Sequence, residues 1–105
     1  MKAPQNLDAE KSVVGSMLIS TSAIDEALTK LNSSDFYDMA NARIFEVIAN
    51  LVNDNKPVDT VTVIERLTKT KYLKAVGGAY YITGLANNSG IDTKSVSQAQ
   101  GVIAI

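Results

Sequence analysis

The sequence predicts an all-α fold, a compact bundle of about six short helices. Apolar residues recur every three or four positions in successive segments, the spacing that gathers side chains on one face of a helix. The breaks between these segments are short and polar, as they are between neighbouring helices of a bundle. A chain of 105 residues, 46% of them hydrophobic, suits one domain over 1–105, and no apolar run approaches the roughly 18 residues of a membrane span.

The first two predicted helices occupy the first third of the chain. The first helix begins near Asn6 or Asp8, either of which can cap it. Its apolar face is formed by Val13, Val14, Met17 and Leu18. The second helix begins at Thr21 or Ser22 and ends in the polar run 32–34. Its apolar face is formed by Ile24, Ala27, Leu28 and Leu31.

The third predicted helix has the clearest helical periodicity in the sequence. It follows a short aromatic link at 35–37 and is capped by Asp38. Its apolar face is formed by Ala40, Ile44, Phe45, Ile48, Leu51 and Val52. We interpret Phe36, Ile44, Phe45 and Ile48 as core residues.

Residues 58–64 are compatible with two structures. Their β-branched content and alternation suggest a strand. Asp59 is equally a good helix cap, and Val61, Ile64 and Leu67 would share one helical face. A lone strand would leave its backbone groups unpaired, so a fourth helix is favoured.

The C-terminal part of the chain contains two further predicted helices. Gly77-Gly78 starts the fifth helix, whose apolar stripe is Tyr81, Ile82 and Leu85, with Tyr80 beside it. Residues 87–90 are expected to form a loop. A weaker sixth helix runs from about Lys94 to the end, with Val96, Ala99, Val102 and Ile103 facing inward.

The composition excludes several kinds of catalytic site. The chain has no Cys and no His, so thiol nucleophiles and imidazole bases are absent. A phosphate-binding P-loop ends in Gly-Lys-Ser/Thr, and Thr93 stands where that Gly is required before Lys94-Ser95. We therefore predict no catalytic residue, no metal site and no cofactor site in this chain.

The carboxylate pairs of the sequence have a structural explanation. Asp8 with Glu10 and Asp25 with Glu26 lie early in predicted helices, where carboxylates stabilise the helix dipole. The polar run near Asp54 lacks the ligand number and spacing of a calcium loop. These groups are not expected to perform acid–base catalysis.

The net charge of −1 conceals an uneven distribution. Residues 1–55 carry four cations against eight carboxylates, a net charge of −4, whereas 56–74 carry five cations against two carboxylates, a net charge of +3. The cations Arg66, Lys69, Lys71 and Lys74 are either a solvated helix end that complements the helix dipole or a basic docking patch. A platform for single-stranded DNA needs several exposed aromatic residues, and only Tyr72 is interleaved here.

Read in order, the motifs of the chain resemble those of the N-terminal domain of the bacterial and phage replicative DNA helicase, the DnaB family. The matching stretches are 4–10, Val13-Val14-Gly15 with Met17-Leu18, Asp35-Phe36-Tyr37, Ile44-Phe45, Pro57-Val58-Asp59 with Thr62-Val63, Leu73, and Gly77-Gly78 with Tyr81-Ile82 and Leu85. The chain departs from the family at Asn41, where the family usually has His, and at 89–93, where the family usually has Pro-Ser/Thr-x-Ala-Asn.

The resemblance implies a helical head that precedes a helical hairpin, a linker and an ATP-driven motor domain, all three absent from this chain. In the family such heads pair with one another and form a collar on a hexameric ring that encircles single-stranded DNA. The collar docks the C-terminal domain of primase, and helicase loaders also act on the ring. ATP and Mg belong to the motor domain of such a parent, a DNA helicase and ATP hydrolase, and the expected location is the cytoplasm, at the replication fork.

The resemblance also assigns candidate partner-binding residues. Asp8 and Tyr81 match positions associated with primase communication, and Glu10 is a neighbouring candidate. The structural alternatives are a cap or dipole role for Asp8, and for Tyr81 a packed aromatic ring with its hydroxyl at the surface.

Three functional hypotheses follow from the sequence. The first is an interaction and assembly module of a replicative helicase. The second is a nucleic-acid-binding element that acts through the basic stretch 66–74. The third is a stand-alone phage protein that copies the head and intercepts primase or a loader.

Overall fold

The computed structural model describes residues 6–88, and within them the chain forms five α-helices, one 3-10 helix and no strand. The elements are α1 (Leu7–Ile19), α2 (Thr21–Lys30), η1 (Ser33–Asp35), α3 (Met39–Asn53), α4 (Thr60–Lys69) and α5 (Gly78–Asn88). The predicted all-α fold is confirmed. The predicted sixth helix lies outside the described residues. In the described range no helix has the length and apolar character needed to cross a membrane.

Polar side chains cap the first three helices; the caps of α1 and α3 are among the predicted ones, whereas Ser20 was not predicted as a cap. The Asn6 side chain accepts a hydrogen bond from the amide of Ala9 at 2.9 Å, so Asn6 rather than Asp8 caps α1. Ser20 caps α2, and Asp38 caps α3 by accepting from Ala40 at 2.7 Å. Each cap satisfies donors that the first turn of a helix would otherwise leave unpaired.

Residues 60–69 form a helix, so the strand alternative for 58–64 is wrong. Asp59 and Thr62 bond reciprocally: the amide of Thr62 donates to Asp59 at 2.8 Å, and the amide of Asp59 donates to the Thr62 hydroxyl at 3.0 Å. The buried face of α4 is Val63 with Leu67, whereas Val61 is 68% exposed. The capping pair therefore determines the structure of this segment more than its β-branched content does.

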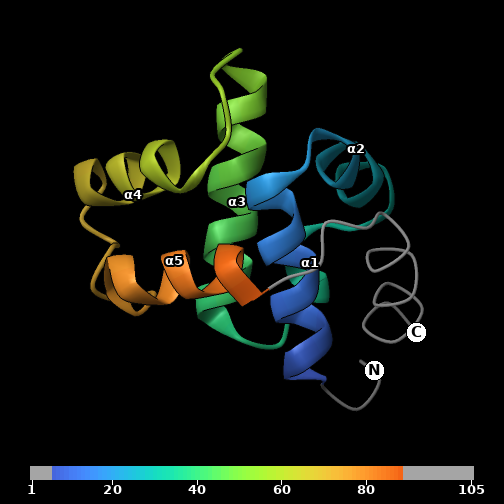
Figure 1. Cartoon of the computed structure of the whole chain (residues 1–105), viewed down its shortest axis with the longest axis horizontal. Helices are drawn as coiled ribbons and strands as arrows, with labels where there is room; N and C mark the ends of the chain where they lie inside the picture. Colours follow the sequence, from blue (N-terminus) through green and yellow to red (C-terminus); the bar gives the residue numbers. More distant parts are fainter. Residues whose placement is uncertain (1–5, 89–105) are drawn as a thin grey trace.

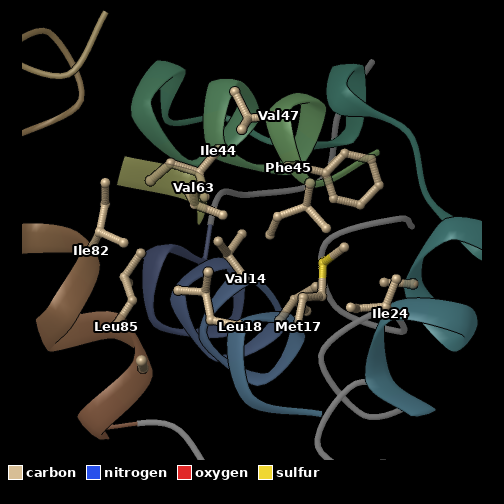
Figure 2. Close-up of a cluster of buried hydrophobic side chains, with 14 of the residues drawn as sticks. Val14, Met17, Leu18, Ile24, Ile44, Phe45, Val47, Val63, Ile82 and Leu85 are labelled. Atoms are coloured by element: carbon tan, nitrogen blue, oxygen red, sulfur yellow. The ribbon is translucent and has the colours of Figure 1, made fainter. Parts of the chain in front are cut away.

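The hydrophobic core is arranged around α1, which contacts α2, α3 and α5. Figure 1 shows α1 near the middle of the molecule, with α2 on one side and α4 and α5 on the other. In Figure 2, Val14, Met17 and Leu18 lie among side chains from the other helices. Those labelled there are Ile24 of α2, Ile44, Phe45 and Val47 of α3, Val63 of α4, and Ile82 and Leu85 of α5.

The predicted core residues of the third helix are confirmed, with one exception at its end. Phe36, Ile44, Phe45 and Ile48 are all buried, and the rings of Phe36 and Phe45 pack with centroids 5.0 Å apart. Val52 was expected on the same face but is 38% exposed, whereas the adjacent Leu51 is buried, so the buried face of α3 ends at Leu51.

The turn before α5 depends on glycine. Gly77 has φ +107, and a Cβ atom there would stand 2.9 Å from the Cβ of Tyr81. A side chain at 77 would therefore be strained both by the backbone and by the contact. Helix α5 then continues through Asn88, so the prediction of a loop at Asn87 and Asn88 is wrong.

Candidate protein-interaction groove

A groove of about 800 Å³ lies where the N-terminal part of α1 meets α5. Its lining includes Asp8, Lys11 and Ser12 from α1, and Tyr80, Tyr81 and Asn88 from α5. Two residues that sequence analysis singled out, Asp8 and Tyr81, thus line one groove although they lie far apart in the chain.

Asp8 contributes an exposed carboxylate to the groove. It stands in the first turn of α1, whose N-terminus favours negative charge. Asn6 performs the capping, and Asp8 forms no ion pair within residues 6–88. Its carboxylate is therefore available to a cation or an N–H donor of a partner.

Tyr80 and Tyr81 are consecutive but differ in exposure. Tyr80 is 92% exposed, whereas Tyr81 is half-buried. Because successive residues of a helix point about 100° apart, one ring projects into solvent while the other packs inward. Sequence analysis placed Tyr80 only beside the apolar stripe and missed it as a groove residue. The available signal was that Tyr80 does not share the helical face of Ile82 and Leu85, which predicts an exposed ring.

Glu10 does not line the groove and is buried, at 1% exposure. Its carboxylate accepts hydrogen bonds from the backbone amides of Tyr37 at 2.7 Å and Asp38 at 3.2 Å. A third bond comes from the side-chain amide of Asn41 at 3.2 Å. These three donors compensate a buried carboxylate and tie the link before α3 to α1.

Asn41 connects Glu10 to Tyr81. Its side chain is fully buried, and the Tyr81 hydroxyl donates a hydrogen bond to its Oδ1 atom. The amide orientation follows from chemistry: an ionised carboxylate only accepts, so Nδ2 faces Glu10 and Oδ1 faces the tyrosine. The Tyr81 hydroxyl thus turns toward the interior. The departure from the family motif at Asn41 falls inside this network.

The pKa of Tyr81 is raised from 10.0 to about 12, mainly by burial, with smaller contributions from the negative charge of Asp38 and, least, from that of Glu10. The hydrogen bond with Asn41 opposes these effects. Tyr81 is therefore a neutral hydrogen-bond donor at neutral pH.

The candidate basic patch, Arg66 with Lys69, Lys71 and Lys74, lies at the C-terminal end of α4 and in the turn that follows. None of the four lines the groove. Arg66 pairs with Asp54 at 3.1 Å, whereas the three lysines are exposed and form no ion pair within residues 6–88.

A cation–π contact borders this patch. The Arg43 guanidinium lies 3.8 Å from the centroid of the Tyr72 ring, which remains 42% exposed. Sequence analysis did not pair these residues, because 29 positions separate them. Since Arg43 covers one ring face, Tyr72 has at most the other face for stacking on a base.

No group of three or more acidic residues in the described part of the chain is arranged to hold a metal ion. The polar groups that meet in the groove are one carboxylate, one ammonium, hydroxyls and amides. Such groups can form hydrogen bonds and ion pairs.

The sequence matches the family model of the DnaB-like helicase N terminal domain over residues 2–103. The chain belongs to this family. It is 42% identical over 79 residues to the replicative DNA helicase DnaB of Mycobacterium leprae (strain TN), a match covering 75% of this chain and 13% of the relative. It is 39% identical over 85 residues to the replicative DNA helicase DnaC of Bacillus subtilis (strain 168), covering 81% of this chain and 19% of the relative.

The fold agrees with this membership. The crystal structure of the N-terminal domain of DnaB helicase from Mycobacterium tuberculosis superposes with a TM-score of 0.89 at 33% identity. The match covers 97% of this chain and 70% of the other. The DnaB-family chain described here thus spans less than a quarter of the curated helicases, while it corresponds to most of the solved N-terminal domain.

Proposed function

We propose that this chain is the N-terminal interaction and assembly domain, 1–105, of a hexameric replicative DNA helicase. Membership of the DnaB-like N-terminal domain family supports the proposal, and the relatives are named replicative DNA helicases. In such a parent, a separate motor domain binds ATP and Mg and unwinds DNA in the cytoplasm. The head then works by contacting proteins, while DNA is held by the parent ring.

The groove between α1 and α5 is the proposed docking site for the C-terminal domain of primase, or for a helicase loader. The observation that carries this proposal is that Asp8 and Tyr81 line the same groove. Tyr80, which also lines the groove, adds an aromatic ring that is 92% exposed. Tyrosine is enriched at protein interfaces because its ring buries apolar area while its hydroxyl forms hydrogen bonds. In this proposal Glu10 acts indirectly, because it is hydrogen-bonded to Asn41, which accepts from the Tyr81 hydroxyl.

Calorimetric titration with the C-terminal domain of primase from the same genome tests the docking site. The wild-type chain is expected to bind, and Tyr81→Ala to weaken binding by about thirtyfold, because loss of an interface tyrosine commonly costs about 2 kcal/mol. Tyr72→Ala is the matched control, since Tyr72 is partly exposed and lies outside the groove. Absence of binding by the wild type contradicts docking of primase, and an equal loss in Tyr72→Ala contradicts the assignment of the docking site to the groove.

The collar role predicts contacts between heads. In this proposal each head pairs with a neighbour and the pairs form a ring on the hexamer. Analytical ultracentrifugation of the chain over a range of concentrations tests it, and the expected result is reversible dimerisation. A chain that stays monomeric at millimolar concentration contradicts pairing through the head alone.

A second candidate function is direct binding of nucleic acid by the basic patch, with Tyr72 beside it. The observation that favours it is the cluster of three exposed lysines without ion pairs in the described residues. Fluorescence anisotropy with a labelled single strand at low salt decides it. Charge reversal of Lys69, Lys71 and Lys74 to Glu should abolish binding if the patch is responsible, and binding that does not change removes this candidate.

A further inference from the structure

The groove tyrosine is held from inside the molecule by a polar side chain that no partner can reach. Asn41 is fully buried on α3, yet both polar atoms of its amide are used. Nδ2 donates to Glu10 at 3.2 Å, and Oδ1 accepts from the Tyr81 hydroxyl. One amide group therefore bonds a residue of α1 and a residue of α5, the two helices that form the groove.

This arrangement fixes the direction of the Tyr81 ring. The tip of the ring is restrained by the hydrogen bond to Asn41, and the backbone at residue 77 leaves no room for a side chain beside the base of Tyr81. The side-chain amide of Asn41 cannot flip, because its Oδ1 atom would then face the Glu10 carboxylate, which has no proton to donate. Glu10 is in turn held by the amides of Tyr37 and Asp38, so the restraint extends to the backbone before α3.

We propose that Asn41 is a positioning residue for the groove: its buried amide sets the orientation of Tyr81 and thereby the affinity of the groove for its partner. The predicted effect on affinity rests on the proposed function. The predicted orientation of Tyr81 does not. A partner that binds a tyrosine already held in one rotamer loses less side-chain entropy than one that must order it.

The first test measures orientation without any partner. In NMR spectra of the chain with isotope-labelled tyrosine, the coupling constants that report χ1 of Tyr81 are expected to indicate one rotamer in the wild type. In Asn41→Leu they are expected to indicate averaging over several rotamers. Tyr37, Tyr72 and Tyr80 serve as internal references whose couplings should not change. A single, unchanged Tyr81 rotamer in Asn41→Leu overturns the proposal.

A rescue variant distinguishes the loss of the Asn41 hydrogen bonds from a change in packing at position 41. Neutral histidine has one donor and one acceptor nitrogen, so Asn41→His can donate to Glu10 and accept from Tyr81, whereas leucine can do neither. Asn41→His is expected to restore the single rotamer. A histidine variant that behaves like the leucine variant contradicts the assigned hydrogen bonds.

The second test measures affinity for the primase C-terminal domain. Asn41→Leu and Tyr81→Phe remove the same hydrogen bond from opposite ends, and each should weaken binding by about three- to tenfold. The double variant should lose no more than either single variant, because the two residues act as a unit. If Asn41→Leu does not fold, Tyr81→Phe still tests the bond.

Ile24→Val is the matched stability control. Ile24 is a buried residue of α2 outside the groove, and its truncation is expected to cost about as much stability as one hydrogen bond. An equal loss of affinity in Ile24→Val assigns the effect to general destabilisation and overturns positioning. A wild type that does not bind contradicts the proposed function instead, while the rotamer measurement still decides the role of Asn41.

Discussion

At the scale of single residues, buried polar side chains form hydrogen bonds to a residue that lines the groove. Glu10, Asn41 and Tyr81 come from three helices and form one hydrogen-bonded chain. Sequence analysis placed Glu10 with Asp8 as a carboxylate of the first turn, and the two have opposite environments. Asp8 is exposed, whereas Glu10 is buried and fully compensated.

Glu10→Gln is expected to lower the free energy of unfolding by about 1–3 kcal/mol, because at least one buried N–H group would face an NH2 group instead of an oxygen. Urea denaturation measures this change. Asp8→Asn makes the same chemical exchange two residues away at an exposed position and should cost less than 1 kcal/mol. Equal costs for the two variants would show that the bonds to Glu10 contribute little.

The pKa of Tyr81 predicts a dependence of stability on pH. Because the pKa rises from 10.0 to about 12 on folding, the folded chain keeps this proton after the unfolded chain has lost it. The stabilisation is complete below pH 10 and is lost as the pH rises toward about 12. Urea denaturation at a series of alkaline pH values should show a steeper decline for the wild type than for Tyr81→Phe. Parallel curves would contradict the raised pKa.

At the scale of elements, the starts of the helices were easier to predict than the contacts between helices. Asp38 and Asp59 cap their helices as predicted, because a cap bonds to residues two or three positions away and such local patterns can be recognised in a sequence. The donors to Glu10 lie 27, 28 and 31 residues away, a separation that no local pattern encodes. The core of α3 was predictable from its period, whereas the groove depends on how α5 packs on α1.

Two glycines, one before α5 and one inside it, provide a test of the turn that precedes this helix. Gly77→Ala is expected to destabilise the chain by more than 1 kcal/mol, since the residue has positive φ and its new Cβ would meet Tyr81 at 2.9 Å. Gly84→Ala, inside α5 with open space around it, should stabilise the chain by about 0.5–1 kcal/mol. Thermal unfolding distinguishes the two, and a stabilised Gly77→Ala would contradict this description of the turn.

At the scale of the whole molecule, two surfaces of different character belong to different elements. The groove is built on α1 and α5, and the lysines of the basic patch lie at the end of α4 and beyond it. The sequence revealed the uneven charge but not this separation, because charge counts carry no spatial information. The near-zero net charge of the chain describes neither surface.

Independence of the two surfaces can be measured. Combined Lys69→Glu and Lys71→Glu should shift the unfolding midpoint by less than about 4 °C, since exposed substitutions cost little. Affinity for the primase C-terminal domain should stay within about twofold of wild type, because sites without shared partners act additively. A loss of affinity comparable to that of Tyr81→Ala would place the patch within the docking surface.

The adjacent tyrosines of α5 also give the domain a pair of natural optical probes. The chain contains no Trp, so tyrosine emission is not masked by energy transfer to an indole. Tyr80 is in solvent and Tyr81 is hydrogen-bonded to the interior, one peptide bond away. A ligand in the groove is therefore expected to change the solvent exposure of Tyr80 more than that of Tyr81, whose hydroxyl is already hydrogen-bonded to a buried residue.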